Sequence, residues 1–167
     1  KSNFENVLFG MKRINDMSPE AKRAWAGELI VSVGLKGFET SYPWQVSGGM
    51  QQRVAIARGL AARSRLLLLD EPLAAVDAQT RAEMQDLLLD LAKKYDQTCV
   101  LVTHDVDEAV YMADRIVVLS KRPTTVVADI AVALPKPREQ LKTREDRTYL
   151  DLRHEVITLI RSMRVAH

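Results

Sequence analysis

The sequence predicts an α/β fold with a mainly parallel sheet and a small helical subdomain. Apolar residues recur at helical spacing up to about residue 45, and short aliphatic strands then alternate with amphipathic helices as far as residue 134. A third observation is size: 167 residues, 47% of them hydrophobic, can build one globular domain with a real core. We therefore expect a helical subdomain at 1–45, an α/β core at 46–134 and a helical extension at 135–167.

The predicted helical subdomain contains two helices. The first is indicated by apolar residues at helical spacing, namely Phe4, Val7, Leu8, Met11 and Ile14. Ser18 followed by Pro19 marks the start of the second, as N-cap and first-turn proline. Its buried stripe would consist of Ala21, Trp25, Leu29 and Val33. Gly34 and Gly37 end this helix, and residues 39–46 form a loop.

The predicted core alternates helices with strands. A helix follows Ser47, and the four leucines at 66–69 indicate a buried parallel strand. A second helix carries the apolar stripe Met84, Leu87, Leu88 and Leu91. Strands at 98–102 and 115–119 flank a short helix at 106–113, and the β-branched segment 124–134 suggests an antiparallel edge strand. One face of a terminal helix is indicated by apolar residues at helical spacing, namely Tyr149, Leu152, Val156, Leu159, Ile160 and Met163.

Composition excludes several classes of function. With 24 basic and 22 acidic side chains the formal charge is only +2, so nothing suggests a nucleic-acid partner. The single cysteine, Cys99, cannot form an internal disulfide, and its aliphatic setting predicts a buried strand position in a reducing cytosol. The aliphatic runs are far shorter than the roughly 20 residues that cross a bilayer. The chain starts at Lys1 without a methionine or an apolar signal core, so we expect an upstream segment.

A first candidate site is the turn Ser47-Gly48-Gly49-Met50. Two glycines after a serine at the start of a helix let backbone N–H groups and the positive end of the helix dipole approach an anion closely. This is phosphate-binding chemistry. The alternative interpretation is a serine N-cap after a glycine turn, a common structural device.

A second candidate is the pair Asp70-Glu71, which leaves the four-leucine strand. Ligands of open α/β sheets gather beyond the carboxyl ends of strands. Asp70 would hold Mg²⁺, usually through a water, while Glu71 would orient and deprotonate an attacking water. The alternative is a strand that simply exits into solvent-facing acidic residues.

His104 and Asp77 are the remaining candidates. His104, in Thr103-His104-Asp105 at the end of the next strand, could donate a hydrogen bond to a γ-phosphate and hold the water-activating carboxylate. A structural histidine is the alternative. Asp77 precedes a helix, where an N-cap is its simplest role.

Together, these motifs resemble the ATP-binding-cassette ATPase family, whose order and element edges they follow over essentially the whole chain. In that resemblance, residues 46–53 match the signature loop, 66–71 the Walker B strand, 74–77 the D-loop, and His104 the switch histidine. The resemblance implies a P-loop NTPase core, with ATP and Mg²⁺ as cofactors. Glu71 and His104 would be catalytic, Asp70 would bind the metal, and the nucleotide would be bound by Ser47, Gly48, Gly49, Met50 and Asp77.

The resemblance also implies partners and a location. Two ATP-binding subunits would form a head-to-tail dimer, in which Ser47, Gly48 and Gly49 press on ATP held by the other subunit. This dimer would drive transmembrane permease subunits, and indirectly serve a substrate-binding protein, at the cytoplasmic face of the cell membrane. No nucleic acid is expected.

Finer features are similar to the importer subgroup for nitrate, sulfonates and taurine. They are Met50 in the signature, the run at 102–113, and the Leu-Pro-Lys-Pro-Arg stretch at 134–138. Val46, Met50 and Val76 depart mildly from the usual family residues without removing a catalytic group. The large departure is that no Gly-Lys dipeptide occurs, so the lysine-bearing phosphate loop is not among these residues and the core is incomplete at its N-terminus.

Three alternatives stay open. Related ATPases serve DNA repair and ribosome-associated functions, although residues 1–46 sustain no coiled-coil heptads. A chain without a phosphate loop could instead be a regulatory or interaction subunit. From Lys121 on, ten basic against six acidic residues could attract anionic headgroups, or simply form a solvated helix face. The transported solute is not encoded in recognisable form.

Overall fold

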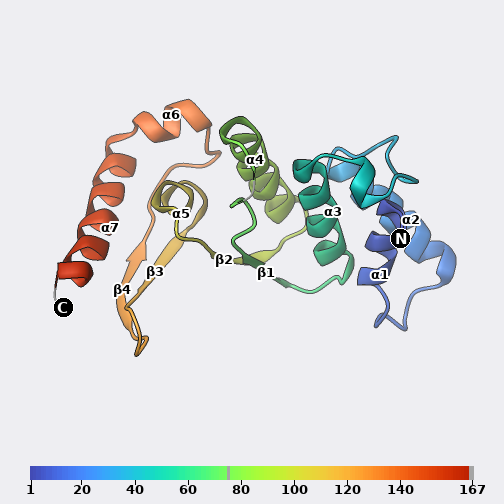
Figure 1. Ribbon diagram of the computed structural model, residues 1–167, viewed down its shortest axis with the longest axis horizontal. Helices are drawn as coiled ribbons and strands as arrows, with labels where there is room; N and C mark the ends of the chain where they lie inside the picture. The colour runs from blue at the N-terminus through green and yellow to red at the C-terminus, as the bar shows by residue number, and fades with distance from the viewer. Residues whose placement is uncertain (75, 166–167) are drawn as a thin grey trace. The chain divides into compact units, whose positions relative to one another are not determined.

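The computed structural model describes residues 1–74 and 76–165. It divides into two compact units, Lys1–Val100 and Leu101–His167, which are shown in Figure 1 and described separately below. The predicted boundaries at residues 45 and 134 follow motifs rather than compactness, and they stay a prediction.

The N-terminal part of the first unit is a helical subdomain. Its elements are α1 (Asn3–Gly10), α2 (Pro19–Ser32), the short 3₁₀ helix η1 (Pro43–Gln45) and α3 (Gly48–Ala61). Ser18 caps α2 as predicted, because its side chain accepts a hydrogen bond from the Ala21 N–H. The helices share a buried core of Val7, Met11, Leu29, Ile30, Val33, Val54, Ala57 and Ala61.

Helices α1 and α3 approach each other closely at a glycine. A Cβ atom on Gly10 would lie 2.2 Å from the carbonyl oxygen of Arg58, a distance that no side chain tolerates. The absence of a side chain at Gly10 therefore lets the two backbones meet. This contact positions α3, whose first turn carries Gly48 and Gly49.

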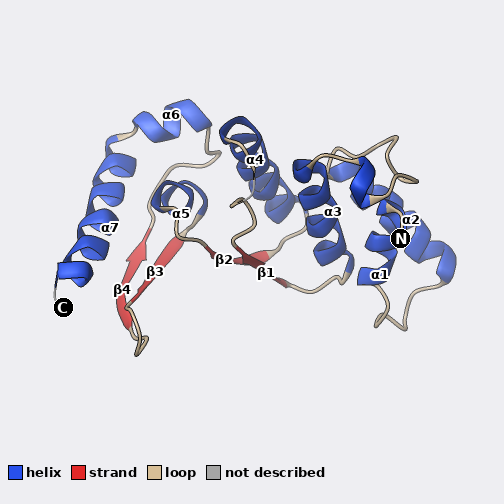
Figure 2. Cartoon of the chain, in the orientation of Figure 1, coloured by secondary structure: helices blue, strands red, loops and turns tan. Residues whose placement is uncertain are grey.

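The rest of the first unit is a strand–helix–strand arrangement, whose last strand continues two residues beyond the end of the unit at Val100. Strand β1 (Leu66–Asp70) is followed by α4 (Ala78–Lys94) and β2 (Thr98–Val102), and the two strands pair in a sheet, as Figure 2 shows. A helical crossover is the connection that parallel strands require. The α4 stripe is confirmed at Met84, Leu88 and Leu91, which are buried.

The predicted burial of these strands was wrong. Leu67 is buried, but Leu66 is 46% exposed and Leu68 is 69% exposed. Cys99, which we expected inside, is exposed as well. The side chains of a strand alternate between two faces. On one face of β1, Leu67 is buried and Leu69 is half-buried, whereas β2 has no buried side chain and only Leu101 is half-buried.

The second unit combines a hairpin with three helices. Helix α5 (Val106–Met112) precedes strands β3 (Arg115–Leu119) and β4 (Val126–Ala131), and then come α6 (Gln140–Glu145) and α7 (Arg147–Val165). The strands are antiparallel, with Ile116 opposite Ile130 and Val118 opposite Ala128, which confirms that the segment forms an antiparallel strand. In the described residues β3 and β4 form a two-stranded sheet of their own, rather than an edge addition to the sheet of β1 and β2. The buried side chains are Val110, Tyr111, Ile116, Val118, Ile130, Leu134, Tyr149 and Val156.

Arg138 fixes the segment between β4 and α6. Its side chain is 1% exposed and donates hydrogen bonds to the Tyr111 carbonyl (2.8 Å) and to Asp114 Oδ1 (3.0 Å). Lys136 Nζ adds an ion pair with Asp114 at 2.9 Å. The Leu-Pro-Lys-Pro-Arg stretch thus anchors the chain beside the end of α5.

Candidate functional site

Helix α3 begins at the Ser-Gly-Gly turn. Ser47 Oγ accepts a hydrogen bond from the Met50 N–H at 3.3 Å, and the Ser47 carbonyl accepts one from the Gln51 N–H at 2.9 Å. A Cβ atom on Gly48 would meet nothing within 4 Å, and both Ser47 and Gly48 are exposed. Ser47 is therefore the N-cap of α3. The cap leaves an exposed helix N-terminus, whose positive dipole end favours an anion.

The structure brings the Ser-Gly-Gly turn next to the first turn of α4. A Cβ atom on Gly49 would lie 2.9 Å from Thr80 Cγ2. Asp77 caps α4: its Oδ1 accepts from the Thr80 N–H at 3.0 Å, and its Oδ2 accepts from the Thr80 hydroxyl at 2.7 Å. The hydrogen bond from the Thr80 N–H is the main cause that lowers the pKa of Asp77. The predicted D-loop residues 74–77 include residue 75, which lies outside the described residues.

Asp70 and Glu71 lie at the end of β1, as predicted. Both are exposed, and Glu71 has a positive φ of 45°. A left-handed backbone costs a non-glycine residue about 1–2 kcal/mol, and such strain concentrates at functional sites. The Glu71 carbonyl accepts a hydrogen bond from the Ala74 N–H at 3.3 Å, while Pro72 and Leu73 are buried and hold the turn. The chain thus bends sharply at the second carboxylate.

The donor set fits a magnesium ion that is shared with a nucleotide. No group of three or more His, Cys, Asp or Glu side chains within the described residues could hold a metal by itself. Mg²⁺ is usually held by one or two carboxylates together with substrate phosphates and water. An exposed Asp70 at a strand end suits that arrangement, and a closed protein cage is not needed.

His104 lies in the second unit, in the turn before α5, and it is exposed. The residues on either side fix the turn. The Asp105 N–H donates to the Thr103 hydroxyl at 3.0 Å, and Asp105 Oδ1 caps α5 by accepting from the N–H groups of Asp107 (2.9 Å) and Glu108 (3.2 Å). The histidine is therefore displayed on a short, hydrogen-bonded turn.

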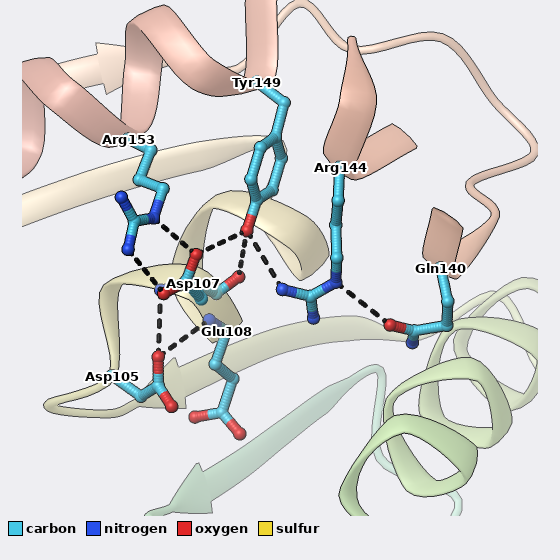
Figure 3. Close-up of polar contacts among 7 residues, drawn as sticks. All are labelled: Asp105, Asp107, Glu108, Gln140, Arg144, Tyr149 and Arg153. Carbon is cyan, nitrogen blue, oxygen red and sulfur yellow. Dashed lines mark hydrogen bonds and ion pairs between the residues drawn. The ribbon is translucent and has the colours of Figure 1, made fainter. Parts of the chain in front are cut away.

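Behind this turn, Asp107 contacts two residues of α7 (Figure 3). Tyr149 Oη donates to Asp107 Oδ1 at 2.9 Å, and Arg153 Nε donates to the same oxygen at 2.7 Å. Partial burial works against ionisation, but the hydrogen bonds from Arg153 and Tyr149 lower the pKa of Asp107. Burial, and then the bond to Asp107, raise the pKa of Tyr149. Sequence reasoning missed this cluster, although Tyr149 and Arg153 share a helix face at i, i+4 spacing.

Comparisons with known proteins agree with the motifs. Residues 1–74 match the family model described as ABC transporter. Over 143 residues the chain is 48% identical to the aliphatic sulfonates import ATP-binding protein SsuB 2 of Pseudomonas syringae pv. tomato, covering 86% of this chain and 60% of that protein. It is 44% identical over 164 residues to the nitrate import ATP-binding protein NrtC of Synechococcus elongatus, covering 97% of this chain and 25% of that protein.

By these similarities the chain resembles the ATP-binding proteins of ABC transporters, within the subgroup for nitrate and sulfonates. Its fold agrees: a solved ABC transporter of the metal-chelate type, in an inward-facing conformation, superimposes with a TM-score of 0.67 at 27% identity. That match covers 75% of this chain and 51% of the other. The predicted fold class, the α/β fold of an ABC transporter ATPase, is therefore confirmed.

The match to ABC proteins is partial in length. The chain spans 60% of the sulfonate relative and a quarter of the nitrate relative. Among the described residues, no helix is long and apolar enough to cross a membrane. Ser47, Gly49, Thr80 and Asp77 lie together in the first unit, and His104 lies in the second. The roles of these ABC-type residues stay predictions.

Proposed function

We propose that this chain is part of the ATP-hydrolysing motor subunit of an ABC importer. The observation that carries the proposal is the carboxylate pair at the end of β1, where Asp70 completes the strand and Glu71 takes a left-handed backbone. A strained acidic residue just beyond a strand is a suitable place for a general base. Glu71 would orient and deprotonate the attacking water.

The remaining groups would bind the nucleotide. Ser47, Gly48, Gly49 and Met50 would meet the phosphates of ATP held by a second subunit, because the N-terminus of α3 is exposed and open beside Gly48. Asp77 would act through the α4 turn that contacts Gly49, and His104 would donate a hydrogen bond to the γ-phosphate. A magnesium ion held with Asp70 would neutralise developing phosphate charge.

The solute and partners follow from the relatives alone. One relative imports aliphatic sulfonates and another imports nitrate, so a small anion is the proposed cargo. The subunit would work as a head-to-tail pair with permease subunits at the cytoplasmic face of the membrane. Sulfonate and nitrate both carry negative oxygen atoms, and selection between them would lie in other chains.

The test is Ser47→Arg in the full-length gene product, because a long cation there would block the dimer interface. We expect nucleotide binding by a single subunit to stay within about threefold, while ATP-driven dimerisation and turnover are lost. Ser18→Arg is the matched control, since Ser18 caps α2 with the same geometry, its Oγ lying 3.1 Å from the Ala21 N. If Ser18→Arg lost ATP-driven dimerisation and turnover to the same extent as Ser47→Arg, Ser47 would be only a structural N-cap.

A second candidate is a regulatory subunit without a phosphate loop. The 167 residues contain no Gly-Lys dipeptide and span 60% of the sulfonate relative, so both candidates are consistent with them. The codons upstream of Lys1 decide between the two. A GxxxxGK[ST] motif there would exclude the regulatory subunit, and a start codon at that point would support it.

A further inference from the structure

The turn that displays His104 is fixed to α5. Asp105 caps the helix through two N–H groups, and its own N–H is bound by the Thr103 hydroxyl. The backbone that carries His104 is therefore tied to the first turn of α5. A contact that fixes this turn also helps to fix the position of the histidine backbone.

Helix α7 contacts the first turn of α5 through Asp107, the second residue of α5. Arg153 forms two contacts with the carboxylate, Nε to Oδ1 at 2.7 Å and Nη2 to Oδ2 at 3.3 Å. Tyr149 Oη adds a bond to Oδ1 at 2.9 Å and lies 3.3 Å from the Asp107 carbonyl oxygen. As Figure 3 shows, the carboxylate lies between the two side chains of α7.

The tyrosine is itself held in place. Its ring is buried, and its hydroxyl accepts a hydrogen bond from Arg144 Nη1 at 3.1 Å. Arg144 is oriented in turn by Gln140 Oε1, 3.1 Å from its Nε. A buried phenol with two charged neighbours has little freedom to rotate. The first turn of α5 is therefore bonded to a side chain, Tyr149, that is itself held in place.

We infer that Tyr149 and Arg153 are positioning residues for His104, acting through Asp107 and the capped first turn of α5. The inference rests on the proposed role of His104 at the γ-phosphate. In this proposal neither residue binds the nucleotide itself. Their loss would let the first turn of α5 shift, and misplacement by about 1 Å is enough to cost a catalytic contact up to about 100-fold.

The experiment compares variants of the full-length gene product in steady-state ATP hydrolysis. We expect Arg153→Gln to lower kcat about tenfold while KM for ATP changes less than about twofold, because the contact at stake strengthens only in the transition state. Arg153→Lys, which keeps the charge, should restore most of the loss. Tyr149→Phe keeps the buried ring and removes only the hydroxyl, so it tests the same link in a folded protein.

Arg147→Gln is the matched control on the same helix. Arg147 pairs with Asp151 at i, i+4, with 3.1 Å from Nε to Oδ1, and both side chains are exposed. Its loss should leave kcat within about twofold of the parent. A tenfold loss in this control would overturn the inference, because any damage to α7 would then slow turnover.

A double-mutant cycle with His104→Ala decides the mechanism. If positioning is correct, Arg153→Gln lowers kcat in the parent but changes it by less than about twofold once His104 is gone. The inference would be overturned if Arg153→Gln lowered kcat by the same factor with and without His104. It would also be overturned if Arg153→Gln lowered kcat in neither background. If His104→Ala alone leaves turnover unchanged, the proposed role of His104 fails instead, so the two failures are distinguishable.

Discussion

The Asp107 carboxylate and the Arg153 guanidinium, 46 residues apart in sequence, join helices α5 and α7, with 2.7 Å between Arg153 Nε and Asp107 Oδ1. Both side chains are partly exposed, at 40% and 43% of their surface. The pairing raises the pKa of Arg153 and helps to lower that of Asp107. The contact therefore stabilises the second unit only while Asp107 is ionised.

This pairing predicts a pH dependence of stability. The folded protein lowers the pKa of Asp107 below its ordinary value of 3.8, so the stabilisation is present above about pH 4 and is lost as the pH falls through the folded-state pKa. We expect Asp107→Asn to cost about 1 kcal/mol in the free energy of unfolding at pH 7, and less at pH 3. Urea unfolding at both pH values measures this. If Asp107→Asn lowered the free energy of unfolding equally at both pH values, the charge of Asp107 would not be the source of the stabilisation.

The open space beside Gly48 predicts that structure and function can be separated. Gly48→Ala meets no atom within 4 Å, so stability should be unchanged or rise by up to about 1 kcal/mol. ATP turnover by the full-length protein should nevertheless fall at least about tenfold, because a methyl group would keep the phosphate away from the helix N-terminus. Thermal unfolding checks the predicted stability, and a turnover assay checks the predicted loss of ATP hydrolysis.

Gly27→Ala is the control for Gly48. Gly27 also lies in a helix, and a Cβ atom there would meet nothing within 4 Å. Both stability and turnover of this variant should match or exceed the parent. Full turnover in Gly48→Ala would mean that no nucleotide approaches the Ser-Gly-Gly turn.

The 167-residue chain by itself is expected to show no measurable ATPase activity and to bind MgATP weakly. It has no Gly-Lys dipeptide, and so lacks the nest of N–H groups and the lysine that hold the β- and γ-phosphates. Isothermal calorimetry on the isolated chain tests this. Micromolar affinity would require a different phosphate site among these residues.

Local chemistry explains which parts of the structure could be predicted. The caps at Ser18, Ser47 and Asp77 were anticipated because a short polar side chain binds N–H groups two or three residues ahead. The antiparallel β4 followed from its β-branched composition. Helix α6 was not predicted, because six residues are too few to show a helical period.

Long-range properties could not be predicted in the same way. Whether Leu68 and Cys99 are buried depends on what packs against the strand, and the strand's own residues do not encode that. The link from Asp107 to Tyr149 and Arg153 crosses more than 40 residues, so no local pattern reveals it. Glu71 was expected at the strand end, but its left-handed backbone was visible only in the structure.

The proposed mechanism depends most on Glu71 as general base. Glu71→Gln keeps the size of the side chain and its hydrogen-bonding capacity, but removes the carboxylate that accepts the proton. Asp70→Asn is the neighbouring control. It should weaken the binding of Mg²⁺ on which turnover depends, because Asp70 is proposed to help hold the ion rather than to activate water.

The most direct test is gel filtration of the full-length Glu71→Gln protein with MgATP, beside a turnover assay. We predict that turnover falls at least about 100-fold while ATP is retained unhydrolysed in a stable dimer, because binding survives and only the chemical step is blocked. Hydrolysis at a rate near that of the parent, or failure to dimerise with ATP, would contradict the assignment and leave Glu71 as an acidic residue at a strand end.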